Sequence, residues 1–66
     1  MIRTAGNEMS AYRKAADDAR RLGCNVVVVW VEGRDSRGRR RMQWQIWRQA
    51  DWTGMQKAIF TLTPEN

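Results

Sequence analysis

Four consecutive valines, followed by tryptophan and valine, constrain the fold of this chain more than any other segment. Residues 26–32 combine β-branched and aromatic side chains, which favour a β-strand. Residues 40–48 predict a second strand, because the apolar residues Met42, Trp44 and Ile46 alternate with Gln43 and Gln45. Asp35 and Gly38 lie between them, at the first and fourth positions of a type I turn with a left-handed glycine, so the two segments predict a β-hairpin.

The sequence of the second strand shows which of its residues face the core, but the sequence of the first strand does not. The core face of the second strand consists of three alternate residues, Met42, Trp44 and Ile46. With a three-residue loop, three residues of the first strand join this core, namely Val26, Val28 and Trp30. With a four-residue loop the other three join it, namely Val27, Val29 and Val31. In either register three apolar residues lie on the opposite face, which is unusual for a sheet with one solvated face.

A helix is predicted before the hairpin, over residues 8–22. Asn7 is a suitable N-cap, and Gly23 fits the left-handed position that ends a helix. Four residues recur on one apolar face at helical spacing, and these are Met9, Tyr12, Ala16 and Ala19. The charged residues on the other side pair at i and i+4, Arg13 with Asp17 and Lys14 with Asp18, and predict a solvated face.

A third strand is predicted over residues 55–62, after a connection over residues 49–54. Ala58, Phe60 and Leu62 suit its core face. The sequence therefore predicts an α+β fold in a single small domain, residues 1–66. One N-terminal helix packs on a three-stranded antiparallel β-meander (α-β-β-β), with room for a short extra N-terminal edge strand near residues 2–4.

A chain of 66 residues buries little core, and the usual means of stabilising so small a domain are missing. Cys24 is the only cysteine and there is no histidine, so the chain can form neither an intrachain disulfide nor a zinc site. We expect no metal and no cofactor. Four tryptophans favour dense aromatic packing, and the surplus apolar strand residues predict a homodimer through the outer sheet face.

The net charge of the chain is concentrated in one segment. Residues 34–41 hold five arginines and one aspartate, a net of +4, whereas the other 58 residues together carry only +1. Guanidinium groups pair with phosphates and carboxylates through two parallel hydrogen bonds. Five arginines and no lysine in eight positions exceed what a solvated turn or protection of a strand edge needs, so the hairpin tip is the primary candidate contact.

A second contact is predicted on the outer sheet face, away from the core face of the second strand. There an outward Trp47 beside Arg48 and Lys57 could stack on a nucleic-acid base. Alternatively, it could pack against a second subunit or under the N-terminal segment. The candidate partner-binding residues are Arg34, Arg37, Arg39, Arg40, Arg41, Trp47, Arg48 and Lys57.

Catalysis and membrane insertion are not expected. General acid–base work would fall to scattered carboxylates, and Cys24 follows the end of a helix that does not stabilise a thiolate. The apolar run at residues 26–31 is too short to cross a bilayer, and we see no signal peptide. A single cysteine favours a reducing, cytoplasmic location.

The predicted order of one helix and three strands resembles the first part of double-stranded-RNA-binding domains. The C-terminal helix of that fold is missing, because the segment Thr-Leu-Thr-Pro-Glu-Asn cannot supply it, and no residue is carried over from that family. In size and style the chain is similar to small phage or mobile-element inhibitor proteins, including anti-CRISPR proteins. That similarity implies a compact, non-catalytic protein that docks on host nucleic-acid machinery.

These features predict a small non-catalytic binding protein with an arginine-rich hairpin tip and nucleic acid as its favoured partner. The alternative is a phage or mobile-element inhibitor, anti-CRISPR-like, that docks on an acidic surface of a host nucleic-acid-handling protein complex. Direct affinity for a polyanion separates the two hypotheses.

Overall fold

Six elements follow one another along the part of the chain that the computed structural model describes, residues 1–54 and 58–65. In chain order they are β1 (Arg3–Ala5), α1 (Glu8–Leu22), β2 (Val26–Arg34), β3 (Arg40–Arg48), the 3-10 helix η1 (Gln49–Asp51) and β4 (Ala58–Leu62). The helix begins where the side chain of Asn7 accepts a hydrogen bond from the Ser10 amide, and it ends at the left-handed Gly23. The α+β class, with one helix before the hairpin, is therefore confirmed.

The sheet is antiparallel, and its strand order is β1-β3-β2-β4. This order differs from the expected meander, because β4 pairs with β2 rather than with β3. The N-terminal edge strand explains the difference. β1 lies along β3, with Arg3 opposite Ile46, and so it occupies the edge that a meander would have given to β4.

The hairpin adopts the register of the three-residue loop. Val28 lies opposite Ile46 and Trp30 opposite Trp44, while the Asp35 amide donates to the Arg39 carbonyl at 3.0 Å. Val28 and Ile46 consequently share the core with the helix. In β4 a bulge opposite Val28 and Val29 interrupts the alternation, so Ala58 lies opposite Val29 and on the outer face, in contrast to its expected position in the core.

The helix turns a different face to the sheet from the one predicted. Its buried apolar residues are Ala11, Ala15 and Ala19, whereas Met9 and Tyr12 are 66% and 46% exposed. The alanines recur every four residues, and their small side chains let the helix lie close against the valines of the sheet. The larger Met9 and Tyr12 side chains are therefore left beside this contact, and the prediction for the helix face was wrong for these two residues.

Replacing Ala15 with leucine is expected to lower the free energy of unfolding by about 1–3 kcal/mol, because the added carbons have no space between helix and sheet. Urea denaturation followed by circular dichroism measures the change. Arg13→Leu is the matched control, since Arg13 is exposed on the same helix. A similar loss of stability in both variants would contradict this packing.

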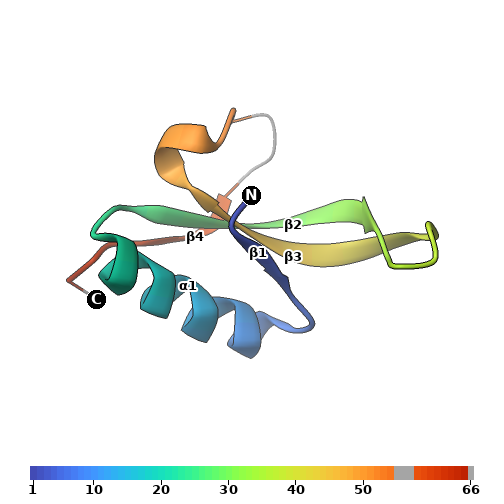
Figure 1. Ribbon diagram of the computed structural model, residues 1–66, viewed down its shortest axis with the longest axis horizontal. Helices are drawn as coiled ribbons and strands as arrows, with labels where there is room; N and C mark the ends of the chain where they lie inside the picture. Colours follow the sequence, from blue (N-terminus) through green and yellow to red (C-terminus); the bar gives the residue numbers. More distant parts are fainter. Residues whose placement is uncertain (55–57, 66) are drawn as a thin grey trace.

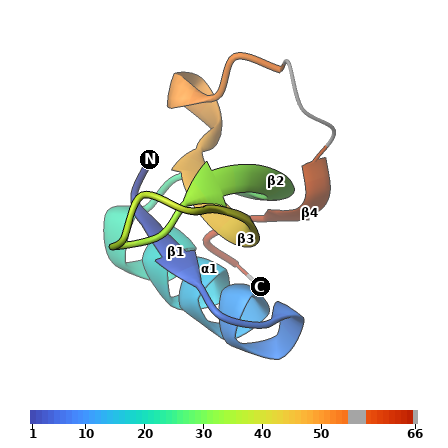
Figure 2. The ribbon, with the colours of Figure 1, turned by 90° about the vertical axis from the view of Figure 1, so that its right-hand side faces the viewer.

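The outer face of the sheet is covered within the chain. Val27 and Val29 are fully buried, although they lie on the face away from α1. Figures 1 and 2 show η1 on this side of the sheet and α1 on the other, so this part of the sheet lies between two layers. The Gln49 amide fastens the connection by donating to the Asn25 carbonyl at 3.0 Å. Val27 and Val29 are thus buried within a single chain. The homodimer stays a prediction, but these valines no longer require a second subunit to cover them.

A buried carboxylate joins β1 to the helix. Asp18 is fully buried, and its oxygens accept hydrogen bonds from Arg3 Nε at 3.0 Å and Arg21 Nη2 at 2.9 Å. Lys14 instead donates to the Thr4 carbonyl at 3.3 Å. The predicted pairing of Lys14 with Asp18 on a solvated face was therefore wrong, because β1 supplies a closer cation from outside the helix.

The described residues include no helix that is both long enough and apolar enough to cross a membrane.

Candidate functional site

The tip of the hairpin is an ordered turn rather than a loose loop. The Asp35 carbonyl accepts a hydrogen bond from the Gly38 amide at 3.0 Å, and Gly38 has a φ of 76°. Asp35 Oδ1 also accepts hydrogen bonds from the Arg37 and Arg39 amides, at 2.9 and 3.0 Å. The predicted turn with its left-handed glycine is confirmed, and one carboxylate holds the backbone that carries the arginines.

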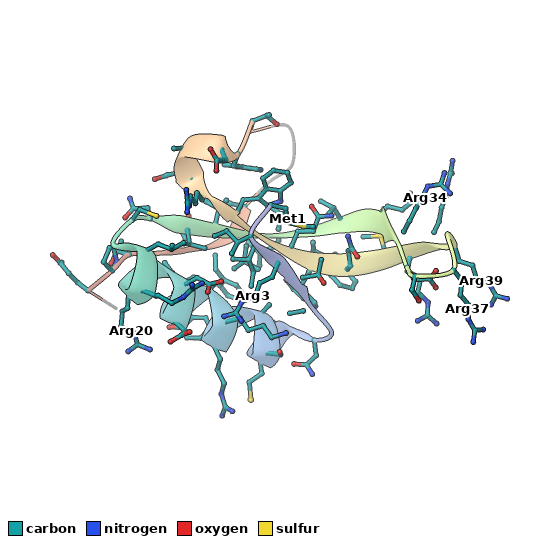
Figure 3. The ribbon with its side chains drawn as sticks, in the orientation of Figure 1. Met1, Arg3, Arg20, Arg34, Arg37 and Arg39 are labelled. Atoms are coloured by element: carbon teal, nitrogen blue, oxygen red, sulfur yellow. The ribbon has the colours of Figure 1, made fainter. Side chains whose placement is uncertain are left out.

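Five exposed arginines surround this turn, and they are called the arginine tip below: Arg34, Arg37, Arg39, Arg40 and Arg41. Figure 3 shows Arg34, Arg37 and Arg39 at the far end of the hairpin, pointing away from the body of the domain. The helix and η1 lie toward the other end of the sheet (Figure 1). The tip is therefore accessible to a partner much larger than the domain itself.

Part of the tip's charge is compensated within the chain. Arg40 Nε lies 3.6 Å from Glu32 Oε1, and Arg41 Nε lies 4.0 Å from Asp35 Oδ2. Both arginines are largely exposed, so these ion pairs are weak and can exchange for an external anion. Arg37 and Arg39 form no ion pair with any residue that the structure describes. These two guanidinium groups are consequently the most available cations of the tip.

The predicted second contact does not join the arginine tip. Trp47 is half-buried, and its Nε1 donates to Gln45 Oε1 at 3.1 Å. Arg48 is exposed at the opposite end of β3, about 27 Å along the strand from Arg40. Lys57 lies outside the described residues. The structure therefore brings the five tip arginines together and leaves Trp47 and Arg48 at the other end of the hairpin.

The exposed tryptophan of the sheet is Trp30, which the sequence did not single out as a contact. Trp30 is 43% exposed and lies on the face toward α1, where its ring centroid is 4.7 Å from that of Trp44. A length argument could have found it. Nine residues of β2 extend about 30 Å, whereas the fifteen residues of α1 extend only about 22 Å, so part of the hairpin surface must remain uncovered.

The chemistry available at this end of the molecule is recognition of anions. The arginine tip offers planar, permanently charged donors, and Glu32, Gly33, Arg34 and Arg40 line a shallow hollow beside it. Within residues 1–54 and 58–65 no three acidic, cysteine or histidine side chains gather as metal ligands. The absence of catalysis and of cofactors stays a prediction. Comparison of the chain with protein families, with curated proteins and with solved structures gave no match.

Proposed function

We propose that this protein is a cytoplasmic, non-catalytic binding protein that grips the phosphates of a nucleic acid with its arginine tip. One observation carries the proposal: five exposed arginines are held by an ordered turn at the projecting end of a hairpin. Electrostatic attraction to phosphates supplies most of the affinity of sequence-independent nucleic-acid binding. An ordered turn reduces the entropy that the arginines lose when they bind.

The charge distribution supports a local contact rather than diffuse attraction. The helix carries four basic and three acidic side chains, so its charges nearly cancel. Residues 34–41 retain a net charge of +4. A polyanion approaching the molecule is therefore drawn to the tip of the hairpin rather than to the helix.

Replacing Arg37 and Arg39 together with glutamine is expected to weaken nucleic-acid binding and its dependence on salt. If each arginine neutralises one phosphate, the slope of log affinity against log salt concentration becomes shallower by about 1.8 for a duplex and about 1.4 for a single strand. Fluorescence anisotropy with labelled oligonucleotides across a salt series measures both slopes.

The matched control removes two charges elsewhere. Arg13 and Arg20 are exposed on α1 and form no ion pair with a described residue, so the double glutamine variant at these positions has the same net charge as the tip variant. Its slope should stay close to that of the parent protein. Equal slopes for the two variants would show that net charge, rather than the arginine tip, determines binding.

A second candidate function is inhibition of a nucleic-acid-handling complex through an acidic protein surface. The contacts of the tip with Glu32 and Asp35 favour it, because they show that these arginines can face carboxylates. Affinity capture of partners with and without nuclease treatment separates the two proposals. A captured protein that nuclease treatment does not release, together with no affinity for oligonucleotides, would favour the inhibitor.

A further inference from the structure

A row of aromatic side chains, two exposed and two partly buried, lies on the helix-side surface of the sheet. This aromatic row consists of Tyr12 on α1, Phe60 on β4, Trp30 on β2 and Trp44 on β3. The Tyr12 and Phe60 rings meet edge to face at a centroid distance of 5.7 Å, and the Trp30 and Trp44 rings are tilted by 41°. The centroid distances of the two pairs, 5.7 Å and 4.7 Å, are typical of favourable aromatic pairs.

The strand register makes these two pairs neighbours. Phe60 lies opposite Val28, and Trp30 is the next residue of β2 on the same face. Diagonal neighbours of this kind are within reach of aromatic side chains. The two pairs therefore lie near each other on the helix-side face of the sheet.

The helix leaves much of this surface open. The buried core under α1 includes Val28 and Ile46, whereas Trp44 packs against this core but is only partly buried, and Trp30 is 43% exposed. Met9 and Tyr12 border a groove at the beginning of the helix, which Asn7, Glu8 and Phe60 complete. Met42, half-exposed, continues the apolar surface from Trp44 toward the tip. Contiguous exposed apolar patches are characteristic of interaction sites, which makes this surface a candidate binding site.

The arginine tip continues from the row on the same face of the hairpin. Arg34 and Arg40 face each other four residues beyond Trp30 and Trp44, and the alternation of the strands therefore places all four on one side. The separation is about 13 Å along the strands. Glu32 lies between them and pairs with Arg40 at 3.6 Å, so the local charge is reduced but the tip as a whole stays positive.

We propose that the aromatic row and the arginine tip together form a binding site for single-stranded nucleic acid. Bases stack on Trp30, with Tyr12 as the second exposed ring of the row, while Arg34 and Arg40 hold the phosphates beyond Trp30. A duplex cannot use this surface, because its bases are already stacked on one another, whereas an unpaired strand presents the faces of its bases. The positive charge beside the aromatic rings favours this occupant over a purely apolar protein partner.

This inference rests on the proposed function and is tested separately from it. The probes are a labelled oligothymidylate and a labelled duplex of mixed sequence. Trp30→Leu is expected to weaken binding of the single strand about tenfold, the usual effect of losing one stacked base, and to leave duplex binding unchanged. Trp30→Phe retains a ring and should recover most of the loss. Trp47→Leu is the matched control on the opposite face of the hairpin.

Each outcome of this experiment is informative, provided that circular dichroism confirms folding. Single-strand binding by Trp30→Leu equal to that of the parent protein would overturn the stacking site, while the arginine variants would still test the tip. Equal losses on both probes would overturn it as well, because stacking should not affect the duplex. A parent protein that binds neither probe would refute the proposed function itself.

Concentration-dependent sedimentation that Trp30→Leu abolishes would assign the row to an interface between copies of this chain. If Trp30→Leu fails to fold, Tyr12→Leu replaces it with the same expected selectivity. Single-strand binding by Tyr12→Leu equal to that of the parent protein, or equal losses on both probes, would then overturn the site.

Discussion

Replacing Arg3 with methionine is expected to lower the free energy of unfolding by about 3 kcal/mol, because it leaves the buried Asp18 carboxylate with one cationic partner instead of two. Arg3 reaches both oxygens of Asp18, at 3.0 and 2.9 Å, whereas Arg21 contacts only one. Asp18 has no exposed surface through which water could replace the lost donor. A domain of 66 residues has a total stability of about 3–10 kcal/mol, so the variant should lose about a third or more of it.

Two further variants make this expectation specific to the buried pair. Arg13→Met removes the same charge from an exposed position of the helix and should change stability little. A double variant, Arg3→Met with Asp18→Leu, removes both members and should be more stable than Arg3→Met alone, since no uncompensated carboxylate remains. Urea denaturation of the four proteins gives the comparison. If Arg3→Met and Arg13→Met unfold at the same urea concentration, the Arg3–Asp18 pair does not stabilise the fold.

The features that could be predicted from the sequence are those determined by neighbouring residues. The helix limits follow from Asn7 and Gly23, which cap its ends within a few residues. The turn follows from Asp35 and Gly38 for the same reason. The five arginines of the tip are adjacent in sequence, so their clustering in space required no knowledge of the remaining fold.

The features that could not be predicted depend on segments distant in the sequence. Asp18 is buried because Arg3, on another element, reaches it, and a helical pattern alone does not contain that contact. The helix faces the sheet with Ala11 and Ala15 rather than Met9. The helix has two possible apolar faces, and the distance between helix and sheet determines which of them is buried. The position of β4 depends on whether β1 occupies the edge of β3.

The candidate site divides in the same way. Its charged part was predicted, whereas its aromatic part was placed on Trp47 and the outer face. That placement assumed that the outer face was open. Instead η1 lies on that side and Val27 and Val29 are buried, while the short helix leaves Trp30 exposed on the other side. The choice between Trp47 and Trp30 thus depended on which layer covers which end of the sheet, and local alternation cannot specify this.

Replacing Ile46 with alanine is the second change expected to have a large effect, with a loss of about 3 kcal/mol of stability. Ile46 is fully buried at the centre of the sheet, opposite Arg3 on one side and Val28 on the other, and it belongs to the core beneath the helix. Neighbouring strands hold its backbone, and the Ile2 amide donates to its carbonyl at 2.7 Å. The surrounding residues can therefore close the resulting cavity only in part, which makes the truncation costly.

A graded series separates this cavity from a general effect of removing isoleucine. Ile46→Val removes one methylene and should cost only about 1 kcal/mol. Ile59→Ala makes the same truncation as Ile46→Ala at an exposed position of β4, and its effect should be within about 0.5 kcal/mol. The variants are compared by urea denaturation, with an excluded osmolyte added to all of them if Ile46→Ala is unfolded in buffer. Equal losses for Ile59→Ala and Ile46→Ala would place the core elsewhere. That result would also contradict the register of β2 and β3, because the same strand pairing places Val28 opposite Ile46 and Trp30 opposite Trp44. The position of Trp30 on the same face as Arg34 and Arg40 depends on this register.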